Sequence, residues 1–225
     1  SLLYFENIKG EKKDEFKFIQ ISTDEVYGSL KNSDPQSLEE SPYFPNSPYS
    51  ASKASADHLV RAWYKTFGLP VITTNCTNNY GPFQHTEKLI PKMISHCIKG
   101  EELPIYGTGK NIRDWLYVID HCEAISLVAE KGKLGETYNI GGKNEISNIE
   151  VVQKICILLD EYRPMDNGSS YSNQIAFVED RRGHDYRYGL DISKIEKEMG
   201  WQPKENFDTG LRKTVEWYLK KYRIE

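Results

Sequence analysis

Two β-branched apolar segments, separated by one long helical segment, constrain the fold of this chain most strongly. Residues 16–22 and Val71–Cys76 have the composition of buried strands, and Pro48–Phe67 between them is long enough for several helical turns. A strand, a helix and a second strand in this order form the unit that builds parallel sheets. We therefore expect an α/β fold with a parallel sheet. Further strands are expected at Leu103–Tyr106, 136–140 and 175–179.

The segments between these strands carry helical patterns. Apolar residues recur in Pro48–Phe67 at roughly helical spacing, which predicts one buried stripe, and Gly68 is expected to end the helix. The stripe consists of Ala51, Ala54, Leu59, Trp63 and Phe67. Further helices are expected at 87–99, from Arg113 through 119–131, at Asn148–Tyr162 after the N-cap Ser147, at 192–199 after the N-cap Asp191, and from Phe207 to Tyr222.

The composition excludes several classes of protein. Of the 225 residues, 38% are hydrophobic and 28% are charged, which is typical of a soluble globular protein. The net charge of −4 argues against a nucleic-acid partner or a polybasic membrane surface. No apolar run approaches the roughly 20 residues that span a bilayer, and no signal peptide is visible, so we expect a cytoplasmic location without membrane attachment.

The cysteines and histidines show no metal-ligand spacing, so no metal site is expected. The absence of a Cys-x-x-Cys pair favours buried, reduced thiols over disulfides. The four cysteines are Cys76, Cys97, Cys122 and Cys156.

A tyrosine and a lysine stand four residues apart in the expected helix 48–67. Tyr49 and Lys53 therefore share one helix face, and both side chains can reach the same ligand. The lysine charge favours the phenolate, which predicts a Tyr49 pKa below the usual value of about 10. Such a phenol can take a proton from an alcohol while the alcohol carbon gives up a hydride. The alternative is an exposed helix turn without function.

Two adjacent carboxyls follow the first expected strand. Asp24 and Glu25 come directly after a buried segment, at the sheet edge where α/β proteins bind ligands. Elimination of water needs one charged carboxylate and one protonated carboxyl, and a closed site can push two neighbouring carboxyls toward these different states. The alternative is a solvated turn. A second polar turn is expected at residues 77–82, after the strand Val71–Cys76.

Three motifs taken together resemble the extended short-chain dehydrogenase/reductases, and within them the nucleotide-sugar 4,6-dehydratases that act on dTDP-glucose. The motifs are residues 22–28 (STDEVYG), 49–53 (YSASK) and 78–82 (NNYGP). The Thr23-Asp24-Glu25 triplet is the specific element, because the related 4-epimerases lack the Asp-Glu pair. The resemblance extends over nearly the whole chain from Phe16 onward.

The resemblance implies an NAD-dependent hydro-lyase. Tyr49 takes the C4 hydroxyl proton as a hydride passes from C4 to NAD, and Thr23 helps to hold that hydroxyl. Glu25 removes the C5 proton, Asp24 protonates the departing C6 hydroxyl, and the hydride returns to C6. The product is a 4-keto-6-deoxy sugar, used for deoxysugars such as rhamnose in surface polysaccharide. The residues implied beside the cofactor are Tyr49, Lys53, Asn79 and Ser22.

The resemblance also implies a nucleotide-sugar pocket. Its Arg113 is the natural diphosphate ligand, because a guanidinium meets phosphate oxygens in a fork. The alternative is a surface ion pair with Asp114 or Asp120. Arg182 departs from the family, where proline is usual, and is expected to loosen its turn. The pocket residues are Thr23, Asn78, Lys88, Leu89, Pro104, Ile105, Tyr106, Arg113, Asn148, Asp180, Arg181, Gly183 and His184.

The family pattern predicts two domains. Residues 1–77, with a contribution from 119–141, are expected to form part of an NAD-binding Rossmann domain, a doubly wound parallel sheet. Residues 78–225 are expected to form a smaller α/β sugar-nucleotide-binding domain. The family's glycine-rich turn for the NAD pyrophosphate is not found in this sequence. We expect a fragment that cannot retain NAD or turn over by itself.

Other functions remain open from the sequence. The chain can belong to a dehydratase for UDP-glucose or another nucleotide sugar, to an epimerase, or to a non-catalytic sugar-nucleotide-binding module. The family commonly dimerises through a four-helix bundle to which the Tyr49 helix contributes, so a homodimer is expected.

Overall fold

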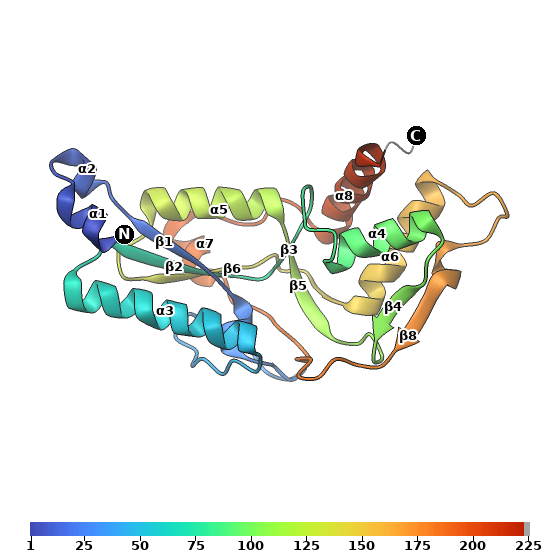
Figure 1. Cartoon of the computed structure of the whole chain (residues 1–225), viewed down its shortest axis with the longest axis horizontal. Coiled ribbons are helices and arrows are strands. Elements are labelled where there is room, and N and C mark those ends of the chain that lie inside the picture. Colours follow the sequence, from blue (N-terminus) through green and yellow to red (C-terminus); the bar gives the residue numbers. More distant parts are fainter. Residues whose placement is uncertain (223–225) are drawn as a thin grey trace. The chain divides into compact units, whose positions relative to one another are not determined.

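The computed structural model describes residues 1–222 and divides into two compact units (Figure 1). The first unit is built from three segments, Ser1–Thr77, His121–Gly141 and Tyr188–Gln202. The second unit contains Asn78–Asp120, Gly142–Arg187 and the described residues from Pro203 onward. The second expected domain included residues 188–202, which the structure assigns to the first unit.

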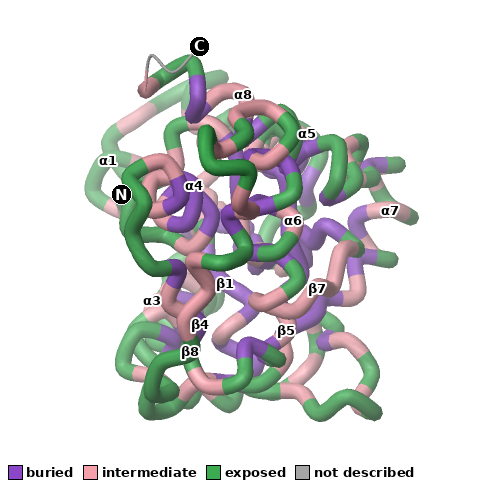
Figure 2. The backbone as a smooth tube through the Cα atoms, turned by 90° about the vertical axis from the view of Figure 1, so that its right-hand side faces the viewer, coloured by how far each residue is buried: buried purple, intermediate pink, exposed green. Residues whose placement is uncertain are grey.

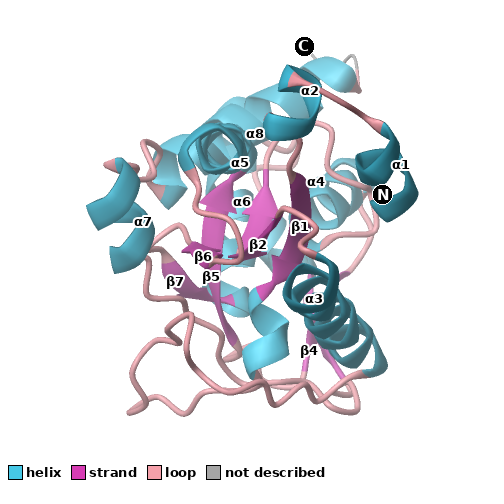
Figure 3. Cartoon of the chain, turned by 90° about the vertical axis from the view of Figure 1, so that its left-hand side faces the viewer, coloured by secondary structure: helices cyan, strands magenta, loops and turns pink. Residues whose placement is uncertain are grey.

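The first unit contains a three-stranded sheet in the order β1-β2-β6, with all strands parallel. The strands are β1 (Phe18–Thr23), β2 (Val71–Cys76) and β6 (Thr137–Ile140). The expected parallel α/β fold is therefore confirmed. Helix α3 (Pro48–Phe67) and helix α5 (Val118–Lys131) cover opposite faces of this sheet (Figure 1 and Figure 3).

Helix α3 begins and ends where the sequence predicts. Ser47 caps it in a reciprocal capping box with Ser50, and Gly68 ends it in the left-handed conformation at φ 66°. The predicted buried stripe is wrong except at one position. The face packed on the sheet consists of Ser50, Ala54 and Asp57. Its small side chains allow the helix to approach β1 closely.

Most of the apolar stripe of α3 faces outward instead. Leu59, Trp63 and Phe67 are 61%, 40% and 55% exposed. Helical spacing shows only that these residues share a face, and it does not say what covers that face. Trp63 and Phe67 stack on each other with their ring centroids 4.8 Å apart.

Short elements complete the first unit. Helix α7 packs against β6, and residues 37 and 190 form a bridge that ties the segment before α7 to the loop after β1. The N-cap of α7 is Ile192, one residue after the predicted cap Asp191. The Asp191 carboxylate still accepts a hydrogen bond from the Ser193 N–H at the start of this helix (2.8 Å). The remaining elements are α1 (Leu2–Asn7), α2 (Glu11–Asp14), η1 (Asp24–Tyr27) and α7 (Ser193–Met199).

The second unit contains two small sheets. Strand β5 (Ile112–Tyr117) pairs parallel with β3 (Asn78–Tyr80) and antiparallel with β7 (Glu145–Ser147). Strand β4 (Leu103–Tyr106) pairs parallel with β8 (Ile175–Val178). Two predictions are wrong here: residues 78–80 form a strand rather than a turn, and residues 113–117 form a strand rather than the start of a helix.

Three helices and a short 3-10 turn enclose the core of the second unit. Buried and exposed stretches alternate along α8, as expected for a helix with one face against a core (Figure 2). Ile90, Ile155 and Val215, one from each helix, are fully buried. Each contributes about 1.5–3 kcal/mol by its removal from water. The elements are α4 (Leu89–Lys99), α6 (Asn148–Tyr162), α8 (Phe207–Lys221) and η2 (Tyr171–Gln174).

Candidate active site

The end of β1 presents three predicted catalytic residues in succession. Thr23 caps the short helix η1: its hydroxyl accepts from the Glu25 N–H (3.3 Å) and donates to Asp24 Oδ1 (3.2 Å). Asp24 is only 3% exposed, whereas Glu25 is half-buried. The strand therefore delivers one enclosed and one more open carboxyl to the carboxyl edge of the sheet.

Tyr49 and Lys53 occupy the first turns of α3. The Tyr49 side chain is 55% exposed. Lys53 Nζ donates to the backbone carbonyl of Ile21 in β1 at 2.6 Å. Lys53 thus fastens the start of the helix to the strand, and its ammonium keeps further protons for other acceptors.

The predicted lowering of the Tyr49 pKa is wrong for this structure. Burial raises the pKa of the Tyr49 phenol, and the negative charges of Glu25 and Asp24 raise it further. The Lys53 ammonium does not offset these effects because it is directed to the Ile21 carbonyl. The same electrostatic coupling supports the prediction that the phenol and the two carboxyls lie in one neighbourhood.

Ser22 lies in the same strand, one residue before Thr23. It is 3% exposed, and its hydroxyl donates to Asp57 Oδ2 at 2.6 Å. The predicted cofactor residue is thus engaged by a helix carboxylate. Sequence reasoning did not single out Asp57. The only sequence signal was an acidic residue one turn after Lys53, on the face that carries Ser50 and Ala54.

The second unit gathers four of its predicted pocket residues around His184. His184 Nδ1 lies 2.7 Å from Asp180 Oδ1, and Arg181 Nη2 lies 3.0 Å from His184 Nε2. The Arg181 guanidinium also stacks over the Tyr106 ring at 5.1 Å. Burial and the charges of Arg181 and Arg113 lower the pKa of His184, and the hydrogen bond to Asp180 raises it. A carboxylate only accepts and a guanidinium only donates, so His184 Nδ1 donates to Asp180 and Nε2 accepts from Arg181.

Arg113 is buried beside this cluster. Its side chain is 8% exposed, and Nη2 donates to the Asp185 carbonyl at 2.8 Å. Nη1 donates to the carbonyls of Ile112 (2.7 Å) and Tyr186 (3.3 Å). A surface ion pair does not fit such burial. The carbonyls hold the guanidinium in a fixed orientation close to His184.

Other predicted pocket residues differ in how accessible their side chains are. Lys88 is exposed at the N-cap of α4, and Leu89 packs on the core. Ile105 is 2% exposed within that core, so only its backbone can meet a ligand. Pro104 is half-buried beside it, and the Asn148 N–H donates to the Asn111 carbonyl at 3.0 Å.

The remaining predicted residues lie in β3 and in the turn that follows Arg181. Asn78 and Asn79 are half-buried, and the Asn79 carbonyl accepts from Gln84 Nε2 at 2.7 Å. Gly183 has φ 67°, which closes the turn after Arg182.

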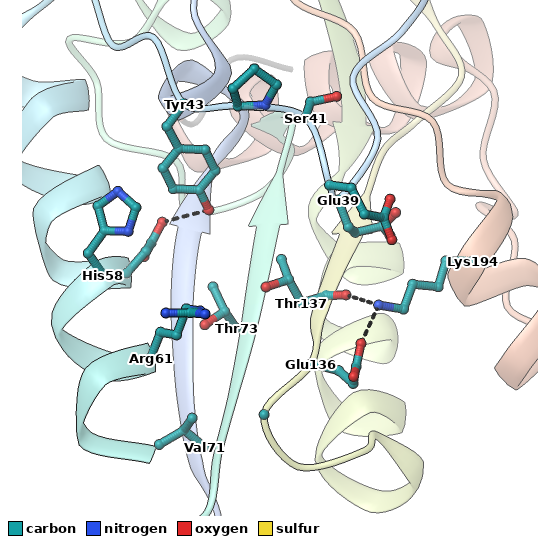
Figure 4. Close-up of a pocket in the computed structure, with 14 residues that line it drawn as sticks. Glu39, Ser41, Tyr43, His58, Arg61, Val71, Thr73, Glu136, Thr137 and Lys194 are labelled. Carbon is teal, nitrogen blue, oxygen red and sulfur yellow. Dashed lines mark hydrogen bonds and ion pairs between the residues drawn. The ribbon is translucent and has the colours of Figure 1, made fainter. Parts of the chain in front are cut away.

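A polar pocket opens on the first unit, beside α3 and over the beginning of β2 and β6 (Figure 4). It contains none of the predicted catalytic residues. In Figure 4 Lys194 contacts Glu136 and the Thr137 carbonyl. The Tyr43 hydroxyl donates to Asp57 Oδ2 at 3.3 Å.

Within residues 1–222, no group of three or more His, Cys, Asp and Glu side chains is placed to hold a metal ion. The four cysteines are free thiols. None of the helices in this part of the chain has the length and apolar character needed to cross a bilayer.

The fold is the Rossmann-type α/β fold of solved nucleotide-sugar dehydratases and epimerases, which superpose on this chain. A family model described as GDP-mannose 4,6 dehydratase matches residues 2–214, and the chain belongs to this family.

Two solved structures and one curated relative define the similarity. The chain is 56% identical over 216 residues to a dTDP-glucose 4,6-dehydratase of Xanthomonas campestris pv. campestris, covering 96% of this chain and 61% of that protein. A crystal structure of dTDP-glucose 4,6-dehydratase from Bacillus anthracis in complex with NAD gives a TM-score of 0.85 at 48% identity, covering 99% of this chain and 67% of that one. A UDP-glucose 4-epimerase from Thermotoga maritima with UDP-glucose gives a TM-score of 0.81 at 28% identity, covering 92% of this chain and 64% of that one.

Proposed function

We propose that the whole protein containing this chain is a dTDP-glucose 4,6-dehydratase, a hydro-lyase that uses NAD and forms dTDP-4-keto-6-deoxyglucose. The similarity to dTDP-glucose 4,6-dehydratases is much higher than that to the epimerase. One structural observation carries the proposal: η1, which carries the two adjacent carboxyls, packs against α3, whose first turn carries the Tyr49 phenol. A dehydratase needs these three groups together, whereas an epimerase does not need the carboxyl pair.

The residues present fit the nicotinamide-ribose end of NAD. Tyr49 is exposed, and Lys53 donates only one of its protons to the Ile21 carbonyl. An ammonium and a phenol one helical turn apart suit the hydroxyls of a ribose. The chain contains no glycine-rich turn, so these residues would hold only that end. When bound, NAD supplies the acceptor for the sugar's hydride.

Each proton transfer is carried out by a different side chain, from the end of β1 or from the start of α3. Tyr49 takes the proton of the C4 hydroxyl, which Thr23 holds, once its phenol has lost its own proton. The positive charge of bound NAD and a protonated Asp24 would both favour that phenolate. Asp24 is enclosed, so it is the better acid for the departing C6 hydroxyl, because burial disfavours a charged carboxylate. Glu25 is more open and serves as the base that removes the C5 proton.

The cluster of the second unit supports binding of the nucleotide diphosphate. Arg113 and Arg181 supply two guanidinium groups, and Lys88 adds an exposed ammonium. Tyr106, stacked under Arg181, offers an aromatic face for the base. The other pocket residues implied by the family are assigned to this same role.

The test is to incubate the whole protein with dTDP-glucose or with UDP-glucose, and to detect a 4-keto sugar by its absorbance in alkali. We expect a 4-keto product from dTDP-glucose. Turnover of UDP-glucose alone would reassign the base, an epimerised sugar would assign the epimerase reaction, and binding without any product would leave a binding module. Any of these three results would contradict the proposal.

We also propose a cytoplasmic homodimer that contributes to deoxysugar synthesis for surface polysaccharide. The exposed apolar stripe of α3, with Leu59, Trp63 and Phe67, supports burial against a second copy. Sedimentation of the whole protein should show a dimer, and Trp63→Glu should shift it toward monomer. A wild-type monomer at all concentrations would contradict this assembly.

A further inference from the structure

Asp57 is a buried carboxylate at the centre of the contact between α3 and β1. It is 5% exposed and receives donors from two elements. From β1, the Ser22 hydroxyl donates to Oδ2 at 2.6 Å and Gln20 Nε2 donates to Oδ1 at 3.1 Å. From the loop before α3, the Tyr43 hydroxyl also donates to Oδ2, at 3.3 Å (Figure 4). Both oxygens are therefore engaged as acceptors.

The surroundings of Asp57 place opposing demands on its charge. Burial raises its pKa above the ordinary aspartate value. The hydrogen bonds from Ser22 and Gln20, and the positive charge of Lys53, act in the opposite direction. A carboxylate kept here against the desolvation cost needs all its donors in place, since a buried charge without them is strongly destabilising.

These contacts fix the register of α3 on β1, that is, the position of the helix along the strand. Gln20 and Ser22 lie on the same face of β1 and both bond Asp57, while the carbonyl of Ile21 between them accepts from Lys53. Three consecutive strand residues are thus fixed to two helix residues one turn apart. The strand then continues directly into Thr23, Asp24 and Glu25, and Tyr49 lies in the first turn of the helix, one turn before Lys53.

The register decides how the phenol meets the carboxyls. A slip of α3 by one residue along its axis moves Tyr49 by about 1.5 Å. A displacement of about 1 Å between reacting groups can cost roughly a hundredfold in rate. The other buried residues of α3 are Ser50 and Ala54, whose small side chains resist sliding weakly.

We propose that Asp57 is a positioning residue for the Tyr49–Lys53 pair, and that its bonds to Ser22 and Gln20 set the register of α3 on β1. This inference rests on the proposed function. It assigns Ser22 to the support of the helix, in place of direct contact with the cofactor.

The test compares Asp57→Asn with wild type in the whole protein. The amide keeps the shape of the side chain, but its NH2 group faces at least one of the donors from Ser22, Gln20 and Tyr43. At least one hydrogen bond that holds the helix on the strand is then lost. We expect kcat to fall about a hundredfold, with the KM for dTDP-glucose changed less than about twofold. In a single turnover, the formation of reduced nicotinamide should slow by the same factor.

Two further variants keep the test decisive. Ser22→Ala should lower kcat in the same way, and the double variant should lose no more than Asp57→Asn alone, because both break one unit. Ser55→Ala is the matched control, because the exposed Ser55 hydroxyl donates to the Ala51 carbonyl of its own helix (2.8 Å). It should behave as wild type. If Asp57→Asn does not fold, Ser22→Ala decides the question.

The outcomes separate this inference from the proposed function. A wild-type protein without turnover of dTDP-glucose counts against the function. The register is then read from amide exchange in the first turns of α3, which should be faster in Ser22→Ala than in Ser55→Ala. If the wild type is active and both Ser22→Ala and Asp57→Asn keep full kcat, the positioning role is overturned. The same holds if a lowered melting temperature is the only change in these variants. Unchanged amide exchange overturns it as well.

Discussion

The two units hold their candidate functional residues in different ways. In the first unit, Thr23 ends a strand, Asp24 follows it directly, and Tyr49 lies in the first turn of a helix. Hydrogen bonds from Ser22 to Asp57 and from Lys53 to Ile21 tie the strand and the helix together. In the second unit, Asp180 and Arg181 are exposed residues of a loop and are joined through His184. Rigid elements suit proton transfer, which depends on short distances, whereas a loop suits ionic contacts that tolerate adjustment.

This contrast predicts a division in the kinetics. Substitutions in the first group should lower kcat, because they disturb groups that act in the transition state. Substitutions in the second group should raise KM, because they remove contacts made equally in the ground and transition states.

The largest effect is expected from Glu25→Gln. The amide keeps the size of the side chain but cannot remove the C5 proton, so elimination should slow about a thousandfold. KM should change little. The measurement is the rate of 4-keto product formation at saturating dTDP-glucose, with Glu40→Gln, in the loop before α3, as the control for the loss of one negative charge. A raised KM with a normal kcat in Glu25→Gln would contradict the expected division between kcat effects in the first unit and KM effects in the second.

Arg181→Ala should give a smaller effect of the opposite kind. The variant loses a charged donor and its stacking on Tyr106, so KM for dTDP-glucose should rise about tenfold at unchanged kcat. Arg182→Ala is the matched control, since it removes the same charge from the neighbouring exposed position. Equal defects in both variants would mean that the cluster attracts anions only through its net charge.

Local signals in the sequence predicted the elements that carry the first group. Helix α3 and strand β2 have the predicted bounds, because the signals that set them are local. Ser47 caps the start of the helix, Gly68 ends it, and the β-branched run defines the strand. Long-range pairing was beyond such signals. Residues 113–117 became a strand through partners at 78–80 and 145–147, which no local pattern reveals.

The buried face of α3 shows the same limit within one helix. Hydrophobic periodicity selected the side with Trp63, yet the sheet packs against Ser50 and Asp57. The reason is a contact with Ser22, which lies 35 residues away in the sequence. A polar contact between remote segments has no periodic trace, so Asp57 was found only in the structure.

Acid should destabilise the protein through His121, a buried histidine of the first unit. Burial lowers the pKa of His121 from 6.5 to about 4, and its Nε2 has no hydrogen-bond partner among residues 1–222. The folded-state pKa lies below the unfolded one, so the neutral ring's stabilisation is present above pH 6.5 and lost as pH falls toward 4. At pH 5 the loss is about 2 kcal/mol.

Urea unfolding at pH 7 and pH 5 measures this loss. His121→Gln cannot titrate, so its difference between the two pH values should be smaller by that amount. His85→Gln is the control, since the His85 side chain is 71% exposed. An unchanged pH dependence in His121→Gln would show that His121 is not the source of the acid sensitivity.

The smallest effect compares two capping serines, one in each unit. Ser47 and Ser147 each cap a helix in a reciprocal capping box, so replacing either by alanine should cost about 1 kcal/mol of stability. Only Ser47 precedes a helix whose first turn carries Tyr49. Ser47→Ala should therefore also lower kcat a few-fold through fraying of that turn, while Ser147→Ala at equal stability should keep kcat. Equal kcat in both variants would show that the contacts of Lys53 and Asp57 hold the phenol in place without the cap.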